Sequence, residues 1–181
     1  QMIPYVTSHV DVPVQRVIDP TLLLTSKEYD KIADERLENE KYLLLYARRY
    51  NPHMEAYAEK LAAENGWKIV EISLRAKNAE KTNRRMFYEA GVEEFLSLTK
   101  YAECVVSNSF HGTIFAVQYS KPLCVFSREQ CDTKITELLA LFGLTDHMLV
   151  SGAEDKGNLN DINYEVVQSR ISEARKKSLE F

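Results

Sequence analysis

Residues 103–119 read ECVVSNSFHGTIFAVQY, and this stretch decides the fold. Its short apolar run, Glu103 to Val106, is typical of a buried strand. The triplet Ser107-Asn108-Ser109 follows directly and offers several residues that are common at helix N-termini. Apolar residues then return at helical spacing with little polar surface between them. The stretch therefore predicts a buried strand, a short polar loop and a largely buried helix.

The same alternation of apolar runs and helical patterns continues on both sides of this stretch. Further strands are predicted at Tyr42 to Ala47, Trp67 to Ile72, Leu123 to Phe126 and Met148 to Val150. Helices are predicted after Asn51-Pro52, from Val92 to Leu98, from Thr133 to Phe142 and from Tyr164 to Leu179. Strands that alternate with helices indicate βαβ units. We therefore expect an α/β fold of the Rossmann-like kind, with an open, mostly parallel sheet and helices on both faces.

Other segments carry weaker patterns. Residues 1–20 have no clear helical period, whereas Val17 to Leu24 predicts the end of a strand and Ser26 to Tyr29 the start of a helix. The acidic segment Asp34 to Glu40 is interpreted as a solvated helix face. Ser73 to Ala90 is polar and without a strong period, so we expect a mobile connection with at most a short helical turn. Its basic part, Lys77 to Arg85, is the best candidate for a lid over a ligand.

Length and composition bound the class of protein. A chain of 181 residues with 45% apolar and 28% charged residues suits one soluble domain, which we place at residues 19–181. We interpret residues 1–18 as a segment left over from a preceding domain. The net charge of −4 argues against nucleic acid as a partner. Because no apolar run is long enough to span a bilayer and no signal peptide is recognisable, we expect a cytoplasmic protein without an integral membrane segment.

The cysteines give no indication of a catalytic or metal-binding role. Cys104 and Cys124 lie in apolar runs, and the three cysteines lack the spacing of a metal site, so we interpret them as reduced core residues. No group of His, Cys, Asp and Glu has metal-ligand spacing either. We therefore expect neither a metal nor a cofactor.

The loop after the deciding strand carries the strongest chemical signal. In an open parallel sheet, ligands bind beyond the carboxyl ends of the strands, where loops lead into helix N-termini. Here Ser107, Asn108, Ser109 and Thr113 supply hydroxyls and an amide, and Gly112 adds flexibility. Backbone N–H groups at such a helix start favour an anion such as phosphate or carboxylate. His111 stands in the same turn and can exchange a proton near neutral pH. Ser and Asn are also common helix caps, so the same residues can be explained without a ligand.

Four segments of the chain resemble a known family. EEFLSL (93–98), AECVVSNSFHGT (102–113) and YSKP (119–122) look like the signature region of the polysaccharide pyruvyl transferases. DPTLLL (19–24) resembles the start of the C-terminal domain of that family. The resemblance covers most of residues 17–150, and its most specific part is the Ser-Phe-His-Gly block.

The resemblance implies one half of an architecture similar to the GT-B glycosyltransferases. It further implies phosphoenolpyruvate as the donor substrate and a glycan or lipid-linked sugar as the acceptor, which would place the enzyme at the inner face of the membrane. His111 would sit at the donor, either as the acid/base group or as a ligand of phosphate or carboxylate. The family's glycine-rich N-terminal region has no counterpart here, so we do not expect the isolated chain to turn over. The oligomeric state is left open.

Donor binding also calls for guanidinium groups, whose forked geometry matches phosphate and carboxylate. Arg48 and Arg49 follow the first predicted strand, and Arg128 follows the fourth, so all three are expected at the same sheet edge as His111. Exposed arginines are often only solubilising. His53 is similarly placed, but it is explained equally well as a surface residue.

Two other readings share the fold. One is a glycosyltransferase domain that binds a nucleotide sugar, and the other is a non-catalytic binding module in which His111 is only a helix-start residue. Preference for a nucleoside diphosphate would favour the first, and the absence of anion binding at residues 107–113 would favour the second.

Overall fold

The computed structural model describes residues 2–73, 84–128, 132–149 and 161–181, and these residues form an open six-stranded sheet. The strand order is β3-β2-β1-β4-β5-β6, and every neighbouring pair is parallel. This is the order of a doubly wound Rossmann sheet, which reverses its direction between β1 and β4. The predicted fold class, an open parallel sheet with helices, is confirmed.

The strands are β1 (Tyr42–Ala47), β2 (Lys68–Ser73), β3 (Arg84–Phe87), β4 (Cys104–Ser107), β5 (Leu123–Phe126) and β6 (Met148–Leu149). The α-helices are α1 (Met2–Thr7), α2 (Ser26–Tyr29), α3 (Pro52–Asn65), α4 (Val92–Lys100), α5 (Phe110–Gln118), α6 (Asp132–Phe142) and α7 (Tyr164–Leu179). Short 3-10 helices within the described residues are η1 (Pro20–Leu22) and η3 (Thr145–His147).

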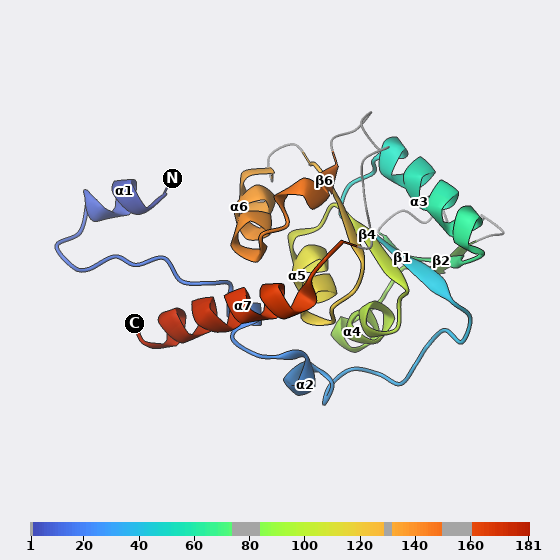
Figure 1. The fold of residues 1–181 in the computed structure, drawn as a ribbon, viewed down its shortest axis with the longest axis horizontal. Helices are drawn as coiled ribbons and strands as arrows, with labels where there is room; N and C mark the ends of the chain where they lie inside the picture. The colour runs from blue at the N-terminus through green and yellow to red at the C-terminus, as the bar shows by residue number, and fades with distance from the viewer. Residues whose placement is uncertain (1, 74–83, 129–131, 150–160) are drawn as a thin grey trace.

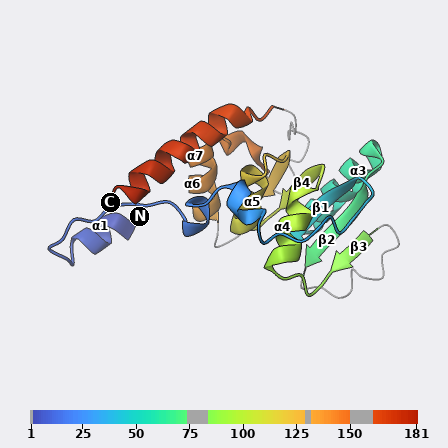
Figure 2. The same cartoon turned by 90° about the horizontal axis from the view of Figure 1, so that it is seen from below.

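The sheet is covered by helices on both faces (Figures 1 and 2). On one face α3 packs through Met54, Ala58 and Ala62 against side chains of β1, β2, β4 and β5. On the other face the larger core joins the sheet to α2, α4, α5, α6 and α7. Helix α5 lies at the centre of this second face and is almost completely buried, as its apolar composition predicts. The helices packed on the two faces of the sheet hold β1 and β4 in place, and with them the loop at the start of α5.

The helix ends follow the capping residues in the sequence. Helix α3 begins after Asn51, whose side chain accepts hydrogen bonds from the backbone N–H groups of His53 and Met54, and it ends at Gly66 in the left-handed conformation. Helix α5 begins after Ser109, whose hydroxyl accepts from the Gly112 N–H. These local signals explain why the observed starts of α3 and α5 agree with the prediction.

Strand β3 is a correction to the sequence analysis. The segment 73–90 was expected to lack strands, yet Arg84–Phe87 pairs with β2 in parallel. The Arg84 side chain is fully buried, and its guanidinium lies 2.6 Å from a carboxylate oxygen of Glu71 and 2.6 Å from one of Glu59. Because ion pairing neutralises this charge, the strand does not need the apolar pattern by which strands are recognised. The predicted lid overlaps this strand at residues 84–85, and its remainder, residues 77–83, lies outside the described residues.

The N-terminal third departs from prediction in three places. Residues 2–7 form the short helix α1, closed by hydrogen bonds from Thr7 and Ser8 to backbone carbonyls one turn earlier. The predicted strand end before residue 24 is the 3-10 helix η1, because the Asp19 side chain caps the N–H of Thr21. The acidic segment 34–40 is irregular and not a helix face, and Glu38 is buried in it.

The two cysteines within the described residues are free and buried, as predicted. Cys104 lies on β4 and Cys124 on β5, in the core under α3. Burial raises the pKa of the Cys124 thiol to about 11, so this thiol stays protonated at neutral pH.

Candidate functional site

The loop between β4 and α5 lies where the strand order of the sheet reverses. The carboxyl ends of β1 and β4 are neighbours, since Tyr46 is paired with Ser107. This is the position where open α/β sheets place their ligands. The structure therefore puts the loop of residues 107–113 at the sheet edge that the sequence predicted.

The hydroxyl groups of this loop are buried and hydrogen-bonded within the protein. Ser107 donates to the Tyr46 carbonyl at 2.8 Å and accepts from the Ser109 N–H at 3.0 Å. Ser109 caps α5, and Thr113 donates back to the Ser109 carbonyl at 3.0 Å. All three residues are at most 3% exposed. Their observed contacts hold the loop in shape, and in this structure none of these side chains is open to solvent.

Asn108 joins the two loops at the reversal point. Its Oδ1 accepts from the Arg48 N–H at 2.9 Å, and its Nδ2 donates to the Arg49 carbonyl at 2.7 Å. Asn108 itself is 1% exposed. The amide thus fixes the backbone that carries both predicted arginines.

Gly112 is required by close packing. A Cβ atom at this position would lie 2.5 Å from Ser107 Oγ and 2.8 Å from Tyr46 Cδ1. The absence of a side chain lets the first turn of α5 approach β1 and β4. Gly112 is predicted from the sequence to add flexibility, whereas its position in the structure has a steric reason.

His111 is the residue of the loop that faces outward. Its side chain is 55% exposed, and its Nε2 lies 3.9 Å from Oδ2 of Asp19. The neighbouring Phe110 ring meets the imidazole edge to face, with ring centroids 5.4 Å apart. His111 is therefore the loop side chain that can reach a ligand without a rearrangement of the core.

A cleft of about 870 Å³ opens beside His111, large enough for a small-molecule ligand. It lies between the segment 16–22, the first turn of α5, and one side of α6 and α7. Its apolar floor includes Ile18, Leu22, Phe110, Leu138 and Leu141. The charged residues around it are Arg16, Asp19, His111, Arg128, Lys134, Glu137 and Lys177. The lining carries four permanent cations and two carboxylates, and two of the cations, Arg16 and Lys177, pair with Glu137 and Glu173. The charge of the lining still favours an anionic ligand over a cationic one.

Of the predicted arginines, Arg128 lines the cleft and is half-buried. Arg48 and Arg49 follow β1 at the predicted edge of the sheet, but they are exposed and do not line the cleft. His53 lies in the first turn of α3, is exposed, and is also absent from the lining. The structure thus brings His111 and Arg128 together and leaves the other three apart from them.

Sequence reasoning missed several residues of the cleft. Arg16 and Asp19 come from the segment before the first strand, and Lys134 and Lys177 come from α6 and α7. The Asp-Pro-Thr pattern at residues 19–21 is a helix-capping signal and would have marked Asp19 as a structured position. Nothing local distinguishes the two lysines from other surface lysines.

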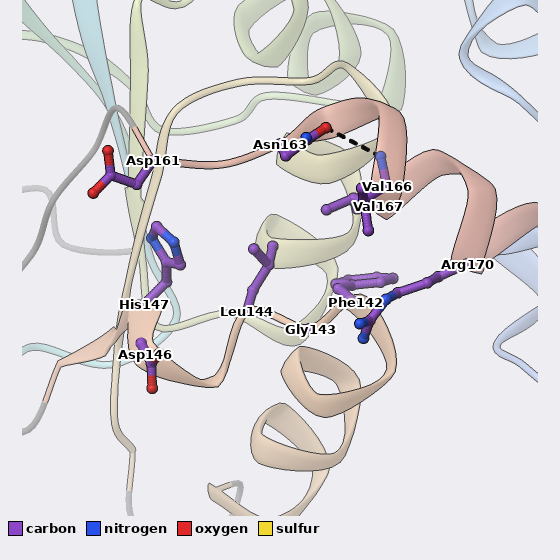
Figure 3. A pocket seen from close by; sticks show the side chains of 10 residues that line it. All are labelled: Phe142, Gly143, Leu144, Asp146, His147, Asp161, Asn163, Val166, Val167 and Arg170. Carbon is purple, nitrogen blue, oxygen red and sulfur yellow. Dashed lines mark hydrogen bonds between the residues drawn. The ribbon is translucent and has the colours of Figure 1, made fainter.

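A second, smaller hollow of about 340 Å³ lies beside η3 and the start of α7 (Figure 3). Asp146, His147 and Asp161 lie on one side of it, and Arg170 reaches across to Phe142 and Gly143 at the end of α6. A Cβ atom on Gly143 would come within 2.5 Å of the Arg170 guanidinium. Arg170 therefore packs on the end of α6, and no predicted site residue lies in this hollow.

No group of three His, Cys, Asp or Glu side chains is arranged to hold a metal ion among residues 2–73, 84–128, 132–149 and 161–181. In the same ranges no helix has the length and apolar character that crossing a membrane requires.

The comparisons with known proteins identify the family. The model of the polysaccharide pyruvyl transferase family matches residues 6–130, more than half of the chain. The chain belongs to the polysaccharide pyruvyl transferase family. No curated protein matches the sequence significantly.

Solved structures resemble the chain at low identity. The UDP-GlcNAc 2-epimerase of Methanocaldococcus jannaschii is 14% identical with a TM-score of 0.46, and the match covers 87% of this chain and 42% of the epimerase. The ADP-heptose heptosyltransferase II of E. coli is 16% identical with a TM-score of 0.41, and the match covers 95% of this chain and 57% of the heptosyltransferase. The glycosyltransferase SnogD of Streptomyces nogalater is 13% identical with a TM-score of 0.48, and the match covers 94% of this chain and 48% of SnogD. The chain thus spans about half the length of the structures it matches.

Proposed function

We propose that this chain is the donor-binding half of a polysaccharide pyruvyl transferase and binds phosphoenolpyruvate in the 870 Å³ cleft beside His111. The observation that carries the proposal is the position of the family's Ser-Phe-His-Gly block. Its histidine and Phe110 line a cleft that carries several cations, while Ser109 and Gly112 of the block are buried. Family membership supplies the reaction class.

The charges of the cleft suit this donor. Phosphoenolpyruvate carries a phosphate and a carboxylate on a compact three-carbon frame. Arg128 offers a forked guanidinium, and Lys134 and His111 offer further donors on the same cleft. The buried polar loop keeps the first turn of α5 in place, and the positive end of this helix adds to the positive field. The apolar floor leaves room for the methylene end of the donor.

The reaction would proceed through proton transfers that a histidine can serve. Protonation of the methylene carbon gives a cationic carbon, which a sugar hydroxyl attacks with loss of its proton. Departure of phosphate and attack by a second hydroxyl, which also loses its proton, close the pyruvate ketal. His111 acts here either as the acid/base group or as a ligand of the donor. The acceptor, a glycan or a lipid-linked sugar, is expected to enter from the other half of the enzyme at the inner face of the membrane.

Calorimetric titration of phosphoenolpyruvate into the chain tests this proposal. We expect saturable binding that His111→Gln and Arg128→Gln each weaken roughly 10- to 100-fold, the loss expected for a hydrogen bond to a charged group. His53→Gln and Arg49→Gln are matched controls, because both residues lie at the same sheet edge but outside the cleft. Binding of a nucleoside diphosphate sugar in preference to phosphoenolpyruvate would overturn the proposal and favour glycosyl transfer. Equal binding by the wild type and the His111 variant would also contradict it.

A further inference from the structure

The segment of residues 19–24 lies along α5 and is held there by side chains from two helices. Gln118, at the end of α5, donates to the carbonyls of Thr21 at 3.1 Å and Leu24 at 2.8 Å. Arg175 of α7 donates to the carbonyls of Leu22 at 2.7 Å and Leu24 at 3.0 Å. The segment therefore runs in the same direction as α5, with Asp19 near the first turn of the helix and Leu24 near its end.

The carboxylate of Asp19 is oriented by the same segment. Its Oδ1 accepts from the N–H of Thr21 at 3.0 Å and from the Thr21 hydroxyl at 2.6 Å. These two bonds occupy one oxygen and direct the other, Oδ2, toward Nε2 of His111 at 3.9 Å. The Asp19 side chain is 24% exposed, so water only partly screens it. The distance between Nε2 and Oδ2 exceeds that of a hydrogen bond by about 1 Å, and the imidazole is exposed.

The other charged groups around the cleft leave this pairing intact. Glu137, the second carboxylate, lies 2.7 Å from Arg16 across the cleft. Lys177, which also lines the cleft, pairs with Glu173 at 2.6 Å along α7. Arg128 and Lys134 are the remaining cations of the lining. Asp19 is thus the carboxylate placed to act on His111.

We propose that Asp19 is the positioning residue for His111. When an anionic donor occupies the cleft, Oδ2 of Asp19 accepts a hydrogen bond from Nε2–H of His111, which orients the imidazole. Nδ1 is then the ring nitrogen available to the donor. This inference rests on the proposed role of His111 in donor binding. Asp19 itself acts through the imidazole and needs no contact with the ligand.

Heteronuclear NMR of the imidazole nitrogens tests the pairing without any ligand assumption. The spectrum of the chain is recorded at one fixed pH with and without inorganic phosphate, and His111 is assigned with His111→Gln. We expect Asp19→Asn to shift the ring resonances of His111 and to leave those of His9, His53 and His147 in place. Asparagine keeps the cap on Thr21, so the variant stays folded with an unchanged Tm. Thr21→Val, which removes one of the two bonds that orient Asp19, is expected to give a smaller shift of the same sign.

Donor affinity supplies the second readout. Asp19→Asn is expected to weaken phosphoenolpyruvate binding roughly two- to fivefold, the range for a partly exposed ion pair, and Asp19→Glu to recover part of the loss. In a His111→Gln background the Asp19→Asn change is expected to have no further effect, because Asp19 acts through His111.

The two readouts separate the inference from the proposed function. A shift of the His111 resonances in Asp19→Asn without any binding of phosphoenolpyruvate supports the pairing and overturns the proposed donor. Unchanged His111 resonances in a folded Asp19→Asn variant overturn the pairing, even if phosphoenolpyruvate binds. An equal loss of affinity from Asp19→Asn with and without His111 overturns it as well, since Asp19 would then act on the ligand directly.

Discussion

The side-chain amide of Asn108 donates a hydrogen bond to the carbonyl of Arg49 at 2.7 Å, and it does so at the point where the strand order of the sheet reverses. The same amide accepts from the Arg48 N–H, so one buried side chain closes the backbone of the β1 loop onto that of the β4 loop. The rigidity of the first turn of α5, and with it the position of His111, depends on this link.

Asn108→Ala is expected to destabilise the protein by about 2–4 kcal/mol. The change removes the hydrogen bonds of Asn108 to a part-buried backbone donor and a part-buried backbone acceptor, and a fully buried group of this kind costs about 1–3 kcal/mol when it loses its partner. Urea denaturation followed by circular dichroism measures the loss. Asn65→Ala is the matched control, because Asn65 bonds only to its own helix at an exposed position, and its effect should stay near 0.5 kcal/mol. Similar losses in the two variants would contradict a bridging role for Asn108.

Gly112→Ala is expected to destabilise the protein by about 1–3 kcal/mol through overpacking. A glycine inside a helix normally gains up to about 1 kcal/mol when it is replaced by alanine. Here the new methyl group would press on the Ser107 hydroxyl and the Tyr46 ring. A thermal melt gives the sign directly, and an increase in Tm would show that the space beside Gly112 is larger than described.

Arg84→Met is expected to destabilise the protein by about 3–5 kcal/mol, because it leaves the buried carboxylate of Glu71 without its ion pair. The double variant Arg84→Met/Glu71→Leu removes both charges and should recover most of the loss. Denaturant unfolding gives the free energy of unfolding of the two variants and of Glu71→Leu, which together with the wild type form a double-mutant cycle. A double variant no more stable than Arg84→Met would contradict the view that an uncompensated charge causes the loss.

The stability contributed by Glu38 is expected to depend on pH. Burial alone would raise the pKa of Glu38, but hydrogen bonds from the Glu40 N–H and ion pairs with Lys68 and Arg85 outweigh burial and lower it below its ordinary value of 4.5. A carboxyl whose pKa is lower in the folded state stabilises the protein above the unfolded value, and this stabilisation is lost as the pH falls through the folded pKa.

Glu38→Gln should therefore reduce the free energy of unfolding at pH 7 by about 1–2 kcal/mol, as for a charge-assisted hydrogen bond. The difference from the wild type should shrink as the pH falls below about 4. Urea unfolding at a series of pH values measures it. A difference that persists unchanged at low pH would show that packing, and not charge, explains the effect.

The sequence predicted most of the sheet and its central helices, because their signals are local. The run from Cys104 to Val106, the cap at Ser109 and the apolar face of α5 are all readable within a short window. Strand β3 could not be predicted in this way. The burial of Arg84 depends on Glu59 and Glu71, which come from α3 and β2 and carry no local mark of the contact.

The candidate site was predicted in position more than in detail. The loop of residues 107–113 was correctly placed at the carboxyl edge of the sheet, but the sequence does not reveal which hydroxyl groups turn inward. The direction of each hydroxyl depends on how close β1 lies to β4. At this distance the Ser107 hydroxyl donates its hydrogen bond to the Tyr46 carbonyl and not to a ligand. The proximity of Asp19 to His111 likewise follows from Gln118 and Arg175, which hold a distant segment along α5.

The most direct test of the central claim is an NMR titration of phosphoenolpyruvate that follows the backbone amides of the whole chain. Saturable shifts confined to the amides of Phe110, His111 and Arg128, and lost in His111→Gln, are the predicted result, with Gly143 and His147 beside the second hollow unaffected. Shifts centred on Gly143 and His147, or no saturable shift with phosphoenolpyruvate while a nucleoside diphosphate sugar binds at His111, would contradict it.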